Sequence, residues 1–192
     1  MRVSETELAG VLLFTPEPHH DERGFFTRTF DTAIARAHGV DLGPSAQDSQ
    51  SRSRRGVVRG MHGRSGRGEA KLVRCAHGAV LDIVIDIRPG SPTFGAATHV
   101  RLDDVEFAHL FVPPGMLHGF QALSDTADVC YRIDRPHDPG EDIAVRYDDP
   151  DLALPWPLPV TTVSRRDAAA PSWRALTEAL TETLTETLTG RA

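Results

Sequence analysis

Short apolar segments separated by glycine and proline constrain the fold of this chain more than any other feature of its sequence. The 192 residues include 16 glycines and 14 prolines, and helical periodicity is scarce before residue 170. The clearest segment, residues 80–87, carries β-branched residues at alternate positions, with Asp82 and Asp86 on the same face as Val80 and Val84. Short strands between turn signals are typical of antiparallel sandwiches and barrels. The pattern therefore predicts an all-β fold.

The remaining predicted elements are strands at residues 56–61, 72–75, 98–102, 110–112 and 128–133, and two helices. Residues 31–39 indicate a short helix with Asp31 as N-cap and Gly39 just past its end. From Ser172, leucine recurs at every fourth position, which predicts an amphipathic helix that ends at Gly190 and packs on the domain; a frayed tail is the alternative. We expect one domain at residues 1–170 and this helix or tail at residues 171–192.

Net charge and cysteine content limit the functions that the chain can have. The formal net charge is -6, so the protein has no general attraction for nucleic acid or an anionic membrane. The two cysteines, Cys75 and Cys130, are too few for a disulfide framework. No apolar run approaches the roughly 20 residues that a membrane helix needs. We therefore expect a cytoplasmic protein with reduced thiols that binds neither nucleic acid nor a membrane.

Polar residues interrupt the predicted strands in a way that favours a lined cavity. Arg59 and His62 lie in segment 56–62, and His118 lies in segment 113–120, where strands normally carry apolar side chains. A buried polar group without a partner is costly, so such a cluster predicts a cavity that these side chains line. Taken singly, each histidine is more often a surface residue or a hydrogen-bonded core residue than part of a site.

Lys71 is the only lysine beside 20 arginines. An ammonium group is a compact charge that can give or lose a proton, which arginine cannot do in proteins. A role that needs such a group is one explanation, and chance survival is the other. Together with Asp82 and Tyr131, Lys71 completes the candidate site.

Residues 113–118 fit the PxGxxH form of the second cupin motif, which invites a metal site. The first cupin motif needs two histidines separated by one residue, whereas His62 is followed by Gly63 and Arg64. One histidine and the distant Glu69 make a poor ligand set. We therefore expect no catalytic metal and no cofactor.

The chain resembles the dTDP-4-dehydrorhamnose 3,5-epimerase family, a metal-free branch of the cupins, over roughly residues 10–170. The resemblance rests on ten segments in the same order, namely residues 21–26, 47–51, 58–62, 71–74, 82–86, 91–95, 114–120, 131–132, 149–150 and 164–167. It implies a cupin-type jelly-roll barrel with short peripheral helices and a C-terminal helix. It also implies an isomerase that epimerises a nucleotide-linked 4-keto-6-deoxyhexose at carbon 3, carbon 5 or both.

The resemblance further implies a catalytic set of four residues. His62, paired with Asp167, is the base toward the hydrogens that flank the ketone, because a carboxylate on the second ring nitrogen fixes the tautomer and raises basicity. Lys71 stabilises the enolate. Tyr131 returns a proton from the opposite face of the sugar ring.

Six more residues are implied to bind substrate. Arg23 grips the nucleotide diphosphate, since guanidinium groups bind such oxygens bidentately. The others, placed around the nucleotide, the sugar and the pyrophosphate, are Phe26, Gln47, Arg59, His118 and Asp82. For Asp82, a core hydrogen bond and a supporting role beside Lys71 are both open. Family members are generally homodimers with sheet exchange, and we expect the same here.

The chain also departs from the family pattern at Arg28, Gly63, Arg64, Pro136 and His137. Glycine in place of an aromatic residue at position 63 is expected to enlarge the pocket, and Arg64 to add charge to it. The substrate could therefore differ from that of the rhamnose pathway. Two other functions remain open: a 3,4-ketoisomerase of the same fold, which Tyr131 argues against, and a sugar-nucleotide-binding protein without activity.

Overall fold

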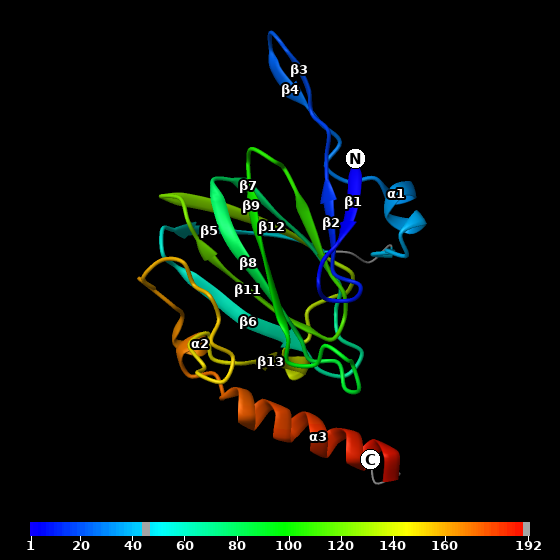
Figure 1. Cartoon of the computed structure of the whole chain (residues 1–192), viewed down its shortest axis with the longest axis vertical. Coiled ribbons are helices and arrows are strands. Elements are labelled where there is room, and N and C mark those ends of the chain that lie inside the picture. The colour runs from blue at the N-terminus through cyan, green and yellow to red at the C-terminus, as the bar shows by residue number, and fades with distance from the viewer. Residues whose placement is uncertain (44–46, 190–192) are drawn as a thin grey trace.

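Two antiparallel sheets face each other in the computed structural model, which describes the backbone of residues 1–43 and 47–189 and their side chains up to residue 182 (Figure 1). The first sheet has the order β1 (Arg2–Glu5), β2 (Leu12–Thr15), β10 (His109–Val112), β7 (Lys71–His77), β12 (Thr126–Ile133), β5 (Gln47–Arg54). The second has the order β13 (Asp142–Ala144), β6 (Val58–Arg64), β11 (Met116–Ala122), β8 (Ala79–Asp86), β9 (Ala97–Asp103). This is the all-β, cupin-type jelly roll that the sequence led us to expect.

The main hydrophobic core lies between the two sheets. It is made by inward-facing residues such as Val73, Leu110 and Val129 of the six-stranded sheet and Val84 and Phe120 of the five-stranded sheet, each at most 1% exposed. Burying an aliphatic or aromatic side chain of this size contributes roughly 1.5–3 kcal/mol. The alternation predicted for residues 80–87 is confirmed, because the side chains of β8 face the core and the opposite face in turn.

The helices cover the outside of the sandwich (Figure 1). α1 (Thr32–Ala37) begins after Asp31, whose carboxylate accepts hydrogen bonds from two backbone N–H groups, and Gly39 follows it with a φ of 78°. α3 (Trp173–Thr189) packs Leu176 and Leu180 against the outer face of the five-stranded sheet. Both predicted helices are confirmed. Gly190 and the side chains of Leu184 and Leu188 lie outside the described residues.

The sequence pattern missed β5, which reads Gln-Asp-Ser-Gln-Ser-Arg-Ser-Arg. This strand lies at the edge of the six-stranded sheet and pairs with β12 along its whole length. Only Ser53 of its side chains is buried. Backbone hydrogen bonds rather than apolar burial hold it, and these leave no signal in the side-chain pattern.

A separate hairpin of β3 (His19–Asp21) and β4 (Gly24–Phe26) stands away from the sandwich near the N-terminus (Figure 1). It exposes two phenylalanines, with Phe25 at 51% and Phe26 at 76% exposed. Among the described helices, none is long and apolar enough to span a bilayer.

Candidate active site

A cavity of about 600 Å³ opens between the two sheets at the end of the sandwich nearest α2 (Arg165–Ala168). Its volume lies in the range of small-molecule sites. Strands β6 and β11 of one sheet, β5, β7 and β12 of the other, and α2 with the segment before it supply its walls. The polar side chains that line it are those of Ser51, Arg59, His62, Lys71, His118, Tyr131, Thr162, Ser164, Arg166 and Asp167.

His62 and Asp167 form a hydrogen-bonded pair at the cavity wall. Nε2 of His62 lies 2.7 Å from Oδ1 of Asp167, which is supplied by α2. Ser164 caps this short helix by accepting the backbone N–H of Asp167, which orients the carboxylate. The side chain of His62 is 38% exposed and that of Asp167 only 5%. The imidazole can therefore reach a ligand while its partner stays fixed behind it.

The protonation state of His62 suits a base. Burial lowers the pKa of the imidazole below its ordinary value, and the hydrogen bond and charge of Asp167 oppose that effect without cancelling it. The ring is therefore neutral at pH 7 and can accept a proton there.

A second histidine–aspartate pair lies directly beside the first. His118 of β11 is the cross-strand neighbour of His62 of β6, and its Nε2 lies 2.9 Å from Oδ2 of Asp82 of β8. Asp82 is fully buried and is absent from the cavity wall. Its carboxylate therefore holds His118 by a core hydrogen bond, whereas Lys71 is paired with Glu69.

Tyr131 enters the cavity from the opposite sheet. Burial raises the pKa of its phenol far above the ordinary value, so the hydroxyl keeps its proton at neutral pH. The hydroxyl lies 3.5 Å from Oγ of Ser51, and the ring packs edge-on to His118 with centroids 6.2 Å apart. Ser51 was not singled out from the sequence, because nothing in the segment showed which of its serines faces inward.

The rest of the wall is positively charged despite the net charge of -6. Lys71 lies 3.0 Å from Glu69, and its side chain is 12% exposed. Arg59 is held by the hydroxyl of Ser53 at 3.0 Å, and Arg166 also lines the cavity. Such a wall favours an anionic ligand. Glu69 was considered only as a poor metal ligand, and Arg166 was missed although it lies next to Asp167.

Two expectations about the pocket were wrong. Gly63 does not enlarge the cavity, because a Cβ at this position would meet the backbone oxygen of Met116 at 2.7 Å. Glycine is needed there for the close approach of β6 to β11. Arg64 adds no charge to the cavity wall, because its side chain is only 7% exposed and forms an ion pair with Glu69. Strand alternation turns residue 63 away from the face that carries His62. Arg64 does not line the cavity, because its side chain is held by Glu69 and Asp142.

Three residues expected at the site lie elsewhere in this chain. Arg23 and Phe26 are on the exposed hairpin, where Arg23 pairs with Asp21. Gln47 is the exposed first residue of β5. None of the three lines the cavity.

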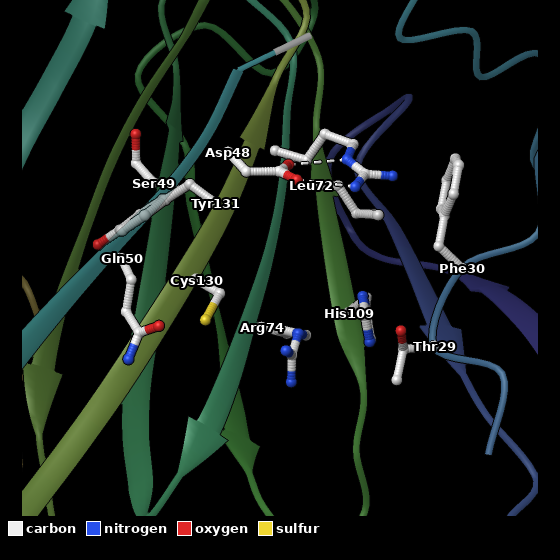
Figure 2. A pocket seen from close by; sticks show the side chains of 11 residues that line it. Thr29, Phe30, Asp48, Ser49, Gln50, Leu72, Arg74, His109, Cys130 and Tyr131 are labelled. Atoms are coloured by element: carbon white, nitrogen blue, oxygen red, sulfur yellow. Dashed lines mark hydrogen bonds and ion pairs between the residues drawn. The ribbon is translucent and has the colours of Figure 1, made fainter. Parts of the chain in front are cut away.

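A second hollow, of about 440 Å³, lies on the outer face of the six-stranded sheet. Cys130 lies beside Arg74 and His109 there, whereas the neighbouring residue of β12, Tyr131, reaches the candidate active site (Figure 2). Burial, together with the charges of Arg74 and Arg132, lowers the pKa of His109 to about 3, so its ring is neutral. Within the described residues, no group of three or more His, Cys, Asp or Glu side chains is arranged to hold a metal ion.

Comparison with known proteins identifies the family. The family model described as dTDP-4-dehydrorhamnose 3,5-epimerase matches residues 5–175. The enzyme of that name from Methanothermobacter thermautotrophicus is 38% identical over 180 residues, which cover 92% of this chain and 95% of that one. The dTDP-4-dehydrorhamnose 3-epimerase of Streptomyces niveus is 41% identical over 88% of this chain and 83% of its own length.

Solved structures agree with the sequence comparison. The 4-keto-6-deoxy sugar epimerase from the novobiocin biosynthetic gene cluster of Streptomyces spheroides superposes with a TM-score of 0.89 at 40% identity, covering 93% of this chain and 90% of that one. An epimerase of Mycobacterium tuberculosis gives the same TM-score at 38% identity. The chain belongs to the dTDP-4-dehydrorhamnose 3,5-epimerase family.

Proposed function

We propose that this isomerase epimerises a dTDP-linked 4-keto-6-deoxyhexose at carbon 3, carbon 5 or both, in deoxysugar biosynthesis. One observation carries the proposal. His62, Lys71 and Tyr131 come from three different strands and line a single cavity, with Asp167 2.7 Å from His62. These groups are the base, the oxyanion partner and the acid that inversion beside a ketone requires.

The first step is removal of a proton from a carbon next to the ketone. Neutral His62 takes that proton and becomes an imidazolium, which the carboxylate of Asp167 stabilises through Nε2. The bond to Asp167 leaves the other ring nitrogen, Nδ1, to face the substrate. The electron pair of the C–H bond moves toward the ketone and makes an enolate.

The enolate oxygen needs a positive partner, and Lys71 supplies it in this scheme. A preorganised donor at such an oxygen is worth roughly 3–4 kcal/mol. Tyr131 then gives its proton to the carbon from the face opposite His62, which inverts the centre. The raised pKa of the phenol keeps that proton available at neutral pH.

The remaining cationic side chains suit the diphosphate and the sugar. Arg59 and Arg166 can each donate several hydrogen bonds to phosphate oxygens. We assign His118, held by Asp82, to the sugar or its ketone. Whether one carbon or two are inverted is a separate matter, since the relatives include both a 3-epimerase and 3,5-epimerases at similar identity.

Two other functions fit the observations less well. A ketoisomerase needs no acid on the far face, whereas a protonated Tyr131 lies across the cavity from the His62 wall. A binding protein without activity would not need His62 and Asp167 within hydrogen-bonding distance, and they are 2.7 Å apart.

We also propose that the active enzyme is a homodimer in which each hairpin completes the partner's site. Arg23 and Phe26 stand exposed on β3–β4, away from the sandwich of their own chain (Figure 1). Co-expressed Arg23→Ala and His62→Ala chains should regain about half of the wild-type activity per mixed dimer, because one site then has both residues intact. If the mixed dimers regain no activity, the hairpin does not complete the partner's active site.

We place the enzyme in the cytoplasm. Cys75 and Cys130 are both free thiols, which suits a reducing compartment.

The decisive experiment offers dTDP-4-keto-6-deoxyglucose and its UDP counterpart to the enzyme in deuterated water, and locates the exchanged carbons by NMR. We expect solvent deuterium at carbon 3, carbon 5 or both, with the dTDP sugar preferred. Tyr131→Phe should spare exchange at carbon 3 and impair inversion at carbon 5, because the base is intact and the acid is missing. Absence of deuterium from every ketosugar, or an unaltered product from Tyr131→Phe, would contradict the scheme.

A further inference from the structure

Lys71 ends a chain of charged side chains whose inner members, Glu69, Arg64 and Asp142, have no part in the proposed reaction. Its ammonium lies 3.0 Å from Oε1 of Glu69, and Oε2 of Glu69 accepts a hydrogen bond of 3.1 Å from Nε of Arg64. The side chains of Glu69 and Arg64 are each 7% exposed. Neither lines the cavity, so both can act on a ligand there only through other residues.

Arg64 is held from several sides. Its guanidinium also donates to the carboxylate of Asp142, to the backbone carbonyl of Asp138 and to Nδ1 of His137. The other oxygen of Asp142 accepts a hydrogen bond of 2.5 Å from Arg166. Alternating charges thus connect the two cations at opposite ends of this network, and both line the cavity. A side chain fixed by this many partners has little freedom to move.

Glu69 is ionised in this setting. Burial alone would raise the pKa of its carboxyl, but the charges and hydrogen bonds of Lys71 and Arg64 outweigh burial, so the pKa lies below its ordinary value. The ionised carboxylate lies 3.0 Å from the Lys71 ammonium and is its counter-charge. The guanidinium of Arg64 binds the other oxygen of the same carboxylate, so Glu69 is shared between two cations.

The surroundings of Lys71 contain other charges, but one contact dominates. The titratable and charged groups that face this region come from five places in the chain. They are Glu69 before β7, His62 and Arg64 of β6, Tyr131 of β12, Asp134, Arg135 and His137 after it, Asp142 of β13, and Arg166 and Asp167 of α2. Among the carboxylates of residues 1–43 and 47–182, Glu69 alone forms an ion pair with the ammonium.

We propose that Glu69 and Arg64 are positioning residues, in which Glu69 sets the place and the charge of the Lys71 ammonium at the cavity wall and Arg64 fixes Glu69. The inference rests on the proposed function, because it matters for catalysis only if Lys71 faces the enolate oxygen. It also gives a reason for arginine at position 64, which the cavity itself does not use.

The single lysine allows a direct test that needs no activity. Protein labelled with ¹³C-lysine gives one lysine side-chain signal, and its chemical shift against pH reports the titration of Lys71 alone. In Glu69→Gln we expect the midpoint to move to lower pH by about one unit, because the ammonium loses its counter-charge. In Arg64→Gln we expect a smaller movement to higher pH. A general loosening of the fold would move the Lys71 midpoint in the same direction in both variants. Movement in opposite directions therefore indicates a direct effect of the two charges.

The same variants are then compared in deuterium exchange with dTDP-4-keto-6-deoxyglucose between pH 6 and 10. Glu69→Gln should lower kcat about threefold more at pH 10 than at pH 8, with a smaller change in KM, because a midpoint one unit below the ordinary lysine value of about 10.4 leaves the ammonium charged at pH 8 and below. Glu69→Asp keeps the charge and should rescue the pH profile. This variant also keeps the test valid if Glu69→Gln folds poorly.

Asp128→Asn is the matched control. Asp128 is a carboxylate that is 8% exposed and paired with Arg52 at 2.7 Å, outside the cavity, and its loss should move neither the Lys71 midpoint nor the exchange profile. An unchanged midpoint in Glu69→Gln would overturn the inference. If Glu69→Gln shifts the midpoint but the wild-type enzyme exchanges no deuterium, the proposed function is overturned. The contact by which Glu69 holds Lys71 would then still stand.

Discussion

The two histidine–aspartate pairs of the cavity make the same bond in different surroundings. His62 and His118 are cross-strand neighbours, with donor–acceptor distances of 2.7 and 2.9 Å to their carboxylates. His62 is 38% exposed and its partner comes from α2, whereas His118 is 5% exposed and its partner from the adjacent strand is fully buried. A histidine that exchanges protons with a ligand must be reachable, while one that shapes a wall need not be. Exposure rather than pairing separates the base from its neighbour.

The largest expected effect comes from breaking the reachable pair. His62→Ala should lower deuterium exchange at both carbons by roughly 10³-fold, because a positioned base is typically worth 10²–10⁴. The measurement is single-turnover exchange followed by NMR. His77→Ala is the control, since His77 makes a similar contact with Asp104 at 3.4 Å outside the cavity. Full activity in His62→Ala would remove the proposed base.

Asp167→Asn should have the next largest effect, on the order of a 10²-fold loss of exchange, because the amide no longer stabilises the imidazolium. Asp167 raises the pKa of His62 against the effect of burial. Its loss should therefore move the acid limb of the kcat/KM profile to lower pH. If the acid limb of the kcat/KM profile does not move, a group other than Asp167 controls the pKa of the base.

The same substitution in the buried pair should act mainly on stability. Asp82→Asn replaces a carboxylate that is fully buried and bonded to His118, and we expect it to cost about 1–3 kcal/mol in urea unfolding. Exchange should fall by roughly tenfold, less than in Asp167→Asn. A greater loss of exchange in Asp82→Asn than in Asp167→Asn would reverse the roles that we assign to the two pairs.

The smallest expected effect is on the pH dependence of stability. The pKa of His62 is lower in the folded chain than in the unfolded one, so the unfolded state binds more protons as pH falls. The contribution to stability is complete above about pH 6.5 and is lost as pH falls below it. For a partly exposed ring we expect less than about 1 kcal/mol. Thermal unfolding of His62→Asn between pH 5 and 8 should show a slightly flatter dependence than the wild type.

Much of the sandwich could be predicted from residue patterns, and some of it could not. A strand rich in β-branched residues can be predicted from its residue pattern, as residues 80–87 were, and Asp31 marked the start of α1. β5 could not be predicted, because its side chains are polar and its backbone hydrogen bonds to β12 do not depend on residue type. His118 could not be predicted as the partner of Asp82, because this contact depends on β11 lying next to β8 in the sheet.

The sequence alone determined the residue types of the site. Resemblance to the family indicated that His62, Lys71, Tyr131 and Asp167 belong together, and their catalytic roles remain predictions. Only the tertiary structure decided which side chains face the cavity, that Gly63 serves close packing and that Arg64 is buried against Glu69. The physical reason is that strand register and sheet order set these contacts. They join residues far apart in the chain, such as His62 and Asp167, through packing that local patterns do not encode.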